Sequence, residues 1–503
     1  MLFNSVVFLG LFLPIVLVGA FFFSRLPGPN SVINFLVVAS LCFYGWHRPW
    51  DLLILIPSVT LNYFAAVVIE HCQTIRRPSL ARIVLTLGIA ADLALIGYFK
   101  YLDFAASTVG ADAPLTGGLR SLALPLGISF FTFQQIKFLV DRFRKEIAQP
   151  PFSDYALFVA FFPHVIAGPI VHHEILLPQF RGPSRSLGHA SLDSFVDGAT
   201  FFLLGLAKKV VLADQFGVYA TTGFDASAAG HPLTFFAAWV AVLSFTLQLY
   251  FDFSGYSDMA FGLARMLGIR FPMNFDSPYQ ATSIIDFWRR WHMTLSQFLR
   301  DYLYIPLGGN RYGAGRRYLN IIITMALGGL WHGAGWTFVF WGALHGAYLV
   351  INHLWNALSS AFELPKRGSW LGLTSSRVIT MLAVIVAWVF FRADSFDSAT
   401  GIVRSMLGGN GTLLPAQFTT SLPWLSHIAE GAATVPYLAD ETVYGFLAAV
   451  LMLVFGYAIV SFAPNLFRMS ANARFWLLVP SFAFVVQKIF FSGAPSSFIY
   501  FRF

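Results

Sequence analysis

The sequence predicts an all-α, polytopic membrane protein, and two features of its composition carry that prediction. Of its 503 residues, 57% are hydrophobic and only 11% are charged, whereas an average soluble domain has roughly 45–50% apolar and about 25% charged residues. Long apolar runs recur from one end of the chain to the other, which leaves too little polar surface for a soluble fold. We expect about ten or eleven transmembrane helices.

Each expected span is an apolar run bounded by charged, Gly-rich or Pro-rich residues. The first run, Leu2–Ser24, has no charged residue and no basic n-region, and it is too long before Arg25 for a secretory signal, so we interpret it as a retained helix. The further spans are residues 32–46, 52–69, 83–99, 122–140, 195–213, 233–251, 378–391, 443–462 and 475–491. In addition, a long apolar segment begins at residue 318, and residues 339–354 continue it.

These spans form one expected integral-membrane domain, residues 1–503. Within it we distinguish N-terminal helices at 1–150, a motif-bearing core at 153–355 and C-terminal helices at 378–503. We see no repeat of fixed period, so no part of the chain is expected to be a copy of another.

The charges between the runs predict the orientation of the chain. Segments 71–82 and 141–146 are basic, whereas the loop at 103–112 is acidic. Because Lys and Arg concentrate in cytoplasmic loops, the two basic segments are expected inside and the acidic loop outside. Counting crossings back from residue 71 puts the N-terminus outside, and the long polar interval 394–441 falls outside as well.

Two segments depart from the pattern of simple apolar runs. Between Ser153 and Gly188 the apolar sequence is broken by Pro and Gly, and irregular backbone at membrane depth is tolerated only inside protein or beside a water-filled cavity. We therefore expect a re-entrant or half-buried segment there. Further along, Asp252, Gly255 and Asp258 interrupt the apolar pattern, so the two carboxylates either cap a broken helix or line a polar tunnel.

The composition argues against several classes of function: the net charge is only +8, and the chain has two cysteines that lie far apart. The basic residues lie in short clusters between apolar runs, as topology signals do, so nucleic-acid binding is not expected. Cys42 and Cys72 lie outside the motif-bearing region, which disfavours a disulfide framework and an acyl-cysteine intermediate. The ligand-type residues between His164 and Glu174 match no standard metal spacing. We expect neither a metal nor a bound cofactor.

His332 is the first candidate for chemistry. It lies in the sequence GGLWHGAGWTF, fifteen residues after Arg317, and at 1.5 Å per residue that is roughly 22 Å into a bilayer core of about 30 Å. A buried neutral imidazole can accept a proton from a hydroxyl and return it to a leaving group. The surrounding glycines allow another helix or a narrow substrate to approach. The alternative interpretation is a packing histidine beside glycines.

His292 is the second candidate, in the sequence WRRWHMTLSQFL. It can orient an anionic donor or a thioester carbonyl, with Arg289 and Arg290 binding phosphate groups. The alternative is an interfacial amphipathic helix, with Trp288 and Trp291 at the headgroups and the arginines on anionic lipid. Spacing alone favours this alternative.

Four sequence blocks resemble the membrane-bound O-acyltransferase family. They are YFDFSGYSDMAFG, NFDSPY, FWRRWHMTLSQFLRDYLYIPLGGNR and LGGLWHGAGWTFVFWGALHG, and both FFPHVIAGPI and the terminal FIYFRF resemble the same family. The similarity is to the bacterial branch that O-acetylates exported polysaccharides such as alginate. It implies helices around a central tunnel in the inner membrane and acyl transfer from a cytoplasmic thioester donor such as acetyl-CoA. In that membrane, the outside location that the loop charges predict for the N-terminus is the periplasm.

The resemblance also implies roles for residues and partners. It makes His332 the catalytic histidine and His292 the second motif histidine. The residues expected to bind the donor or line the tunnel are Arg289, Arg290, Trp288, Trp331, Asp252 and Asp258. The expected partners are membrane lipids, acetyl-CoA as a substrate, and a periplasmic acetyltransferase that completes the transfer to the polymer.

Three alternatives stay open at this point. The acceptor can be another polymer, such as cellulose or a teichoic-acid-like molecule that receives its acyl group from a carrier-protein donor. The chain can instead be an ion-coupled transporter whose intramembrane Asp and His residues form an ion path. It can also be a structural scaffold of a polymer-secretion complex.

Overall fold

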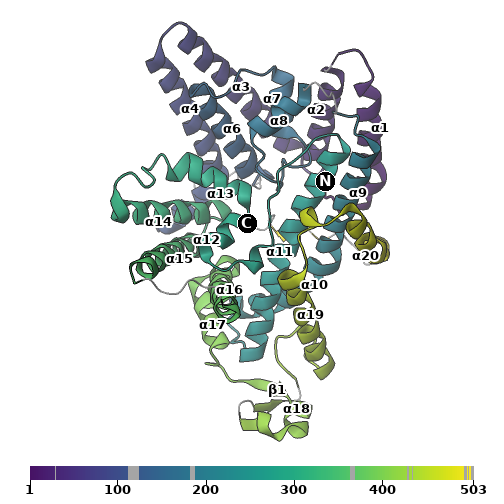
Figure 1. Cartoon of the computed structure of the whole chain (residues 1–503), viewed down its shortest axis with the longest axis vertical. Helices are drawn as coiled ribbons and strands as arrows, with labels where there is room; N and C mark the ends of the chain where they lie inside the picture. The colour runs from purple at the N-terminus through teal and green to yellow at the C-terminus, as the bar shows by residue number, and fades with distance from the viewer. Residues whose placement is uncertain are drawn as a thin grey trace. The chain divides into compact units, whose positions relative to one another are not determined.

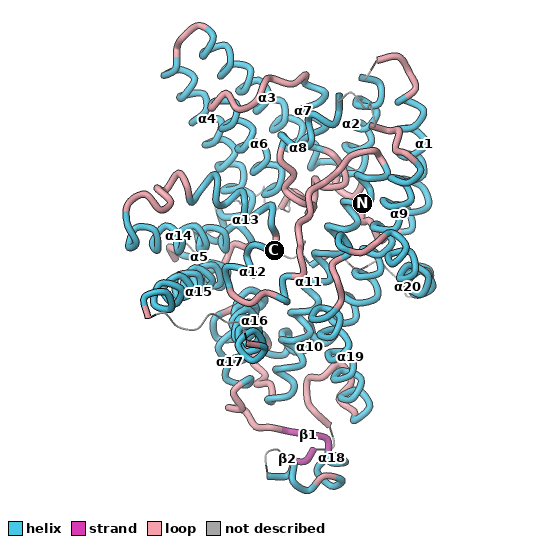
Figure 2. Tube along the Cα trace, in the orientation of Figure 1, coloured by secondary structure: helices cyan, strands magenta, loops and turns pink. Residues whose placement is uncertain are grey.

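The computed structural model is almost entirely helical (Figure 1, Figure 2). It describes residues 1–28, 30–110, 124–181, 187–362, 369–427, 430–432, 434–491, 496 and 498–499. Two compact units form: the first comprises Met1–Ala207, Gly255–Met273 and Ser470–Arg502, and the second comprises Lys208–Ser254 and Asn274–Met469. The predicted all-α fold class is confirmed.

The first unit contains the helices from both ends of the chain. They are α1 (Leu13–Ser24), α2 (Asn30–Gly45), α3 (Leu52–Thr74), α4 (Pro78–Ile96), α5 (Leu102–Thr108), α6 (Ile128–Phe143), α7 (Phe152–Ala160), α8 (His173–Arg181), α9 (Leu192–Ala207) and α20 (Ala471–Phe491). Of the predicted loop at 103–112, the last two residues lie outside the described ones, as do Tyr500–Phe503 of the terminal block.

The second unit contains the motif-bearing helices and one pair of strands. Its elements are α10 (Asp214–Ala228), α12 (Ile284–Arg290), α13 (Met293–Leu299), α14 (Gly313–His332), α15 (Trp336–Ala361), α16 (Trp370–Arg392), α17 (Phe396–Met406), β1 (Leu413–Pro415), α18 (Ala416–Ser421), β2 (Glu430–Ala432) and α19 (Val443–Phe462). The strands pair in parallel, with Leu413 opposite Glu430. Helix α11 (Phe235–Met266) contributes its first part to this unit and its last part to the other.

Five helical segments are long and apolar enough to cross a membrane, counted over the described residues. They are Pro49–Thr74, Pro78–Thr108, α11, α16 and α19, and the shorter segments Phe8–Ser24 and Asn30–Gly45 are also apolar. The chain is therefore a multi-pass membrane protein. Each of these segments overlaps a predicted span, while the total of ten or eleven crossings stays a prediction.

Helix α11 runs without a break through the place where the sequence predicted an interruption. Gly255 lies inside this helix, and within the first unit a side chain at Gly205 would come within 2.6 Å of the Gly255 carbonyl oxygen. Glycine is therefore used here for close contact between α9 and α11. The unbroken helix excludes the alternative in which these carboxylates cap a broken helix, whereas tunnel lining stays a prediction.

The predicted broken segment after residue 153 is confirmed. Helix α7 ends at Ala160, α8 begins at His173, and the residues between them form no helix. This stretch is buried in the first unit, and the Phe162 amide donates to Ser40 Oγ at 3.1 Å. Irregular backbone is thus enclosed by protein, as the absence of water in a bilayer requires.

Helices α14 and α15 form an antiparallel hairpin with direct backbone contact, and they lie side by side in Figure 1. A Cβ atom at Gly342 would lie 2.1 Å from the Met325 carbonyl oxygen, and one at Gly329 would lie 2.1 Å from the Phe338 carbonyl oxygen. These glycines therefore allow the two helices to approach. For Gly329, one of the glycines before His332, this was one of the two reasons that the sequence predicted.

We expect Gly342→Ala to destabilise the protein by about 1–3 kcal/mol, because the added methyl group forces α14 and α15 apart. Thermal unfolding in detergent measures the effect. Gly315→Ala is the matched control, since a Cβ at Gly315 meets no atom within 4 Å. Equal melting temperatures for the two variants would contradict the close packing of the hairpin.

Candidate active site

His332 is the last residue of α14. The sequence predicted a histidine inside a longer apolar helix, but the helix ends at this residue and α15 begins at Trp336. The intervening Gly333 has an extended backbone, and a Cβ at this position would lie 2.2 Å from the Phe338 ring. The turn therefore depends on a small residue, and it fixes the imidazole at a helix end.

Three aromatic rings surround the His332 imidazole. The ring centroids of Trp331, Trp341 and Phe391 lie 4.8, 5.3 and 5.4 Å from it, all at steep interplanar angles. Only 5% of His332 is exposed. Aromatic rings exclude water, so the imidazole lies in a largely dry environment.

His292 is completely buried in the same unit. Its ring packs edge-on against Phe253 at 4.7 Å and lies 6.3 Å from Trp331. Neither ring nitrogen has a hydrogen-bond partner on another residue in the described part of the chain. Burial lowers the pKa of His292 to about 3, so the ring is neutral at pH 7. The interfacial-helix interpretation is wrong for this residue, because the histidine and both flanking tryptophans pack inward.

The backbone of His292 is in the left-handed region, with φ of 44°. Only a few per cent of residues other than glycine adopt such a backbone, and it persists where the surrounding structure enforces it. Asn274 provides that constraint: its carbonyl oxygen accepts from the Met293 amide at 3.0 Å, and its side-chain Oδ1 accepts from the Thr294 hydroxyl at 3.0 Å. The NFDSPY block thus positions the WRRWH block.

Trp331 contacts both candidate histidines. Its ring centroid lies 4.8 Å from that of His332 and 6.3 Å from that of His292. The structure therefore brings together the two histidines that the sequence singled out, through the tryptophan that precedes one of them. Two sequence blocks forty residues apart meet at this point.

His345 is a buried residue of this cluster that the sequence analysis did not select. Its Nδ1 accepts a hydrogen bond from Trp288 Nε1 at 3.3 Å, and its ring lies 5.0 Å from Trp341. Trp288 therefore positions a histidine here, whereas the sequence predicted that it lines the donor path. The sequence did contain one indication of this contact: His345 follows Trp341 by four residues, so the two side chains lie on the same face of their helix.

The two predicted donor-binding arginines have different environments. Arg290 Nε lies 2.8 Å from Asp286 Oδ1, and its Nη1 donates to the Asp276 carbonyl oxygen at 3.4 Å. Arg289 is exposed and forms no ion pair with a described residue. Arg290 thus holds α12 to the NFDSPY block, which leaves Arg289 as the better candidate for a ligand.

The two predicted tunnel carboxylates also differ. Asp252 lies 2.6 Å from Lys209 Nζ, which also lies 2.9 Å from Asp214, so Asp252 belongs to a buried ion-pair network. Asp258 is buried in the first unit, on the part of α11 that packs against α9. Neither carboxylate caps a helix, since both lie inside α11.

Three ligand-type residues of the first unit, Asp141, His173 and Glu174, bring their ligand atoms within 4.8 Å of one another. The Lys137 ammonium lies 2.9 Å from both carboxylates. A lysine at the centre of the group neutralises it as a metal ion would, so these residues fit a salt-bridge network better than a metal site.

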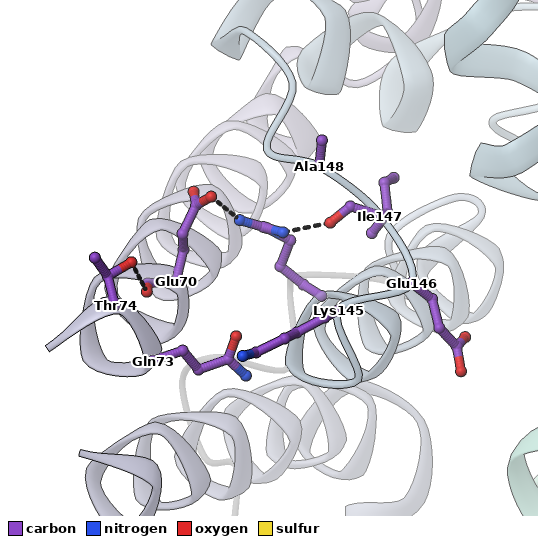
Figure 3. Close-up of a pocket in the computed structure, with 8 residues that line it drawn as sticks. Glu70, Gln73, Thr74, Lys145, Glu146, Ile147 and Ala148 are labelled. Atoms are coloured by element: carbon purple, nitrogen blue, oxygen red, sulfur yellow. Dashed lines mark hydrogen bonds and ion pairs between the residues drawn. The ribbon is translucent and has the colours of Figure 1, made fainter. Parts of the chain in front are cut away.

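A polar pocket of about 390 Å³ lies at the end of α3, where the loop after α6 passes it (Figure 3). Its arginine, Arg142, lies 2.5 Å from Glu70 Oε1 and donates to the Ile147 carbonyl oxygen. Two glutamates and Lys145 complete its charged lining. Because the pocket holds both signs of charge and its arginine is already engaged, nothing about it selects one kind of ligand.

The arrangement in the second unit is suited to acid–base chemistry in a dry environment. It holds two buried histidines, His292 and His332, within an enclosure of tryptophan and phenylalanine rings, in a helical protein of the membrane. Such a site can move a proton to and from a reacting oxygen without competition from water.

Comparisons with known proteins agree with this class. A family model of the membrane-bound O-acyltransferases matches residues 119–391. A peptidoglycan O-acetyltransferase of Helicobacter pylori is 37% identical, with 100% of this chain and 98% of the relative covered. A probable alginate O-acetylase of Azotobacter vinelandii is 42% identical over 82% of this chain and 79% of the relative.

The chain belongs to the membrane-bound O-acyltransferase family, and it is an O-acyltransferase. A teichoic acid D-alanyltransferase of Streptococcus thermophilus is a further relative, 30% identical over 48% of this chain and 60% of its own length. The transporter and scaffold alternatives have no support from these relatives.

We expect Lys209→Met to destabilise the protein by about 3–5 kcal/mol, because it leaves the Asp252 carboxylate buried without its cation. The double variant Lys209→Met/Asp252→Leu should recover part of that loss, since it also removes the orphaned charge. Thermal unfolding in detergent compares them. If Asp252→Asn left stability unchanged and slowed acyl transfer instead, Asp252 would line the substrate path after all.

Proposed function

We propose that this chain takes an acetyl group from acetyl-CoA on the cytoplasmic side of the bacterial inner membrane and passes it outward for O-acetylation of an exported polysaccharide, alginate in the first instance. The support is the alginate O-acetylase relatives at 41–43% identity, together with the basic segments that orient the chain. The N-terminus lies in the periplasm in this topology.

The observation that carries the proposal is the meeting of His332 and His292 at Trp331. His292 is fully buried, and neither of its ring nitrogens has a hydrogen-bond partner on another described residue; a buried polar group of this kind costs free energy that an apolar side chain would not. The enclosure is thus suited to a reaction in which polar atoms of the substrate supply contacts to His292.

In the proposed reaction, His332 accepts the proton of the acceptor hydroxyl as its oxygen attacks the thioester carbonyl carbon. The C–O bond forms, the tetrahedral intermediate collapses, and the C–S bond breaks. His332 then returns the proton to the leaving thiolate, so the histidine ends as it began. The N–H of neutral His292 donates a hydrogen bond to the carbonyl oxygen, where negative charge develops.

A periplasmic acetyltransferase is the proposed partner, to which the acetyl group is handed for transfer to the polymer. The interval 394–441, placed outside by its charges, contains α17, the strand pair and α18, so it is a folded segment on the face that such a partner would reach. The immediate acceptor in this scheme is a hydroxyl of the partner or of the polymer.

Peptidoglycan is a second candidate polymer. The Helicobacter pylori relative is named for it, and the similarity covers 98% of that relative, against 79% of the alginate O-acetylase relative from Azotobacter vinelandii. Deletion of the gene, followed by measurement of ester-linked acetate on each isolated polymer, decides between the two. Loss of acetate from peptidoglycan alone would overturn the alginate assignment.

We expect His332→Ala to lower acetyl transfer from radiolabelled acetyl-CoA by about 10²–10⁴-fold, the usual contribution of a general base. Purified protein in nanodiscs with the periplasmic partner present gives the measurement. His292→Asn should also slow transfer, and Asn is suitable because it tolerates the left-handed backbone.

The matched control is His71→Ala, which removes an exposed histidine of the first unit and should leave the rate unchanged. If His332→Ala, folded as judged by its melting temperature, kept the wild-type rate, His332 would not be the catalytic base.

A further inference from the structure

A carboxyl group lies buried in the first unit without a described cation beside it. Asp92 belongs to α4, in the apolar segment Pro78–Thr108 that can cross a membrane, and only 3% of it is exposed. Among the described residues, the one side chain that hydrogen-bonds to it is Asn62 of α3, whose Nδ2 donates to Asp92 Oδ1 at 2.8 Å. We propose that Asp92 carries a proton at pH 7 and that its hydroxyl donates to Asn62 Oδ1 in return. The two side chains then form a cyclic carboxyl–amide pair that joins α3 to α4.

Two oxygen atoms of these side chains indicate the proton. Asn62 Oδ1 and Asp92 Oδ2 are buried, and neither has a hydrogen-bond partner in the part of the chain that the structure describes. The oxygens of an ionised carboxylate and of an amide are acceptors only, so an ionised Asp92 leaves both of these atoms without a donor. One proton on Asp92 Oδ2 supplies the donor that both lack, because the new hydroxyl donates from one oxygen to the other.

The orientation of the Asn62 amide supports this assignment. Its Nδ2 donates to the Ser58 carbonyl oxygen at 3.1 Å as well as to Asp92. Both amide hydrogens are therefore used, and exchanging the nitrogen with the oxygen would bring an oxygen against the Ser58 carbonyl. Asn62 Oδ1 is thus the end of the amide that needs a donor, and Asp92 is the side chain already bonded to the other end.

The described groups around the pair carry no positive charge. From α7, the fully buried Tyr155 lies close enough for Asp92 to act on it electrostatically. From α6, Gln135 donates to the Ser58 hydroxyl at 3.0 Å, and Ser58 lies one turn before Asn62 on α3. Tyrosine and glutamine side chains are neutral at pH 7. A lone carboxylate is costly in such a setting, whereas a neutral carboxyl with two hydrogen bonds is not.

A metal cation is the other means of neutralising a buried carboxylate, but the oxygens described here do not suit one. Hard cations take several oxygen ligands, about six to eight for Ca²⁺. Besides Asp92 Oδ2, the unpartnered oxygens described around the pair are Asn62 Oδ1 and the Tyr155 hydroxyl. A proton needs a single acceptor, which Asn62 provides.

The pair holds two membrane helices together without a net charge. Asn62 and Asp92 are 30 residues apart in the sequence, on α3 and α4, which pack against each other. Polar side chains that bond across helices in this way are a usual means of association in a bilayer. The Lys137 network of the same unit uses opposite charges instead. Asp92 thus gives the first unit a proton-binding site, and this site takes no part in the proposed acyl transfer.

Infrared difference spectroscopy on the protein in nanodiscs at pH 7 tests for the proton. A protonated carboxyl has a C=O stretching band that is separate from the two stretching bands of a carboxylate. We expect Asp92→Asn to lack one protonated-carboxyl band that the wild type has. The matched control is Asp103→Asn, which removes an exposed carboxylate of the same unit and should lose carboxylate bands instead. If Asp92→Asn also lost only carboxylate bands, Asp92 would be ionised and the proposal overturned.

Two further spectra distinguish the proton from other ways of satisfying the carboxyl group. Spectra in sodium chloride and in choline chloride should be identical, whereas a carboxylate band of Asp92 in sodium chloride alone would make this a cation site. Tyr155→Phe should keep the protonated-carboxyl band. A band that appears only after this substitution would mean that the Tyr155 hydroxyl donates to an ionised Asp92 in the native chain. Either of these results overturns the proposal.

Substitutions at the two ends of the pair test its contribution to stability. Asp92→Asn keeps one donor and one acceptor in nearly the same shape, so its melting temperature should stay close to that of the wild type. Asp92→Leu leaves Asn62 buried without its partner and should lower the melting temperature by about 2–4 °C or more. Asn62→Leu should shift the protonated-carboxyl band, because the carboxyl loses both hydrogen bonds. Equal losses of stability in the two Asp92 variants, or an unshifted band in Asn62→Leu, would overturn the pairing.

Discussion

The backbone contact between α14 and α15 is the interaction on which the candidate site depends. Helices normally pack at a distance set by their side chains, but Gly329 and Gly342 let these two approach until backbone meets backbone. That approach brings Trp341 of α15 beside His332 of α14, while His345 lies beside Trp341 one turn further along α15. Without this approach, Trp341 could not contact His332, and the enclosure around His332 would lose one of its aromatic rings.

Several acidic and basic side chains described inside this protein have a polar partner close by. Lys209 lies between Asp214 and Asp252, Lys137 lies between Asp141 and Glu174, and the buried Asp92 accepts from the Asn62 amide at 2.8 Å. A bilayer offers no water to solvate a lone charge, so each one needs a partner from the chain itself. The buried histidines are different, because an imidazole can be neutral and still exchange a proton. The buried ion pairs are therefore structural, whereas the buried histidines are the groups that can take part in proton transfer.

The sequence predicted the class of the fold and the two histidines of the site, because both signals are local. Apolar runs and charged loops identify membrane helices, and His332 and His292 stand out within apolar motif blocks. The sequence left roles open where a residue's environment comes from elsewhere in the chain: it could not show whether Asp252 caps a helix or lines a tunnel, because its ion-pair partner Lys209 lies more than forty residues earlier. Arg289 and Arg290 are adjacent and chemically identical, and only the position of Asp286 and Asp276 distinguishes them. The role of His345 depended on contact with Trp288, which spacing along one helix could not reveal.

The left-handed backbone of His292 has a consequence for substitutions at this position. Such a conformation costs roughly 1–3 kcal/mol in a residue other than glycine, so the position carries a permanent loss of stability. Glycine would relieve the cost, and it would also delete the imidazole. The ring also packs against Phe253 and Trp331, so its removal would leave a cavity whose cost offsets the relief of strain. The backbone strain and the ring packing at this position are therefore coupled, and neither can be changed without the other.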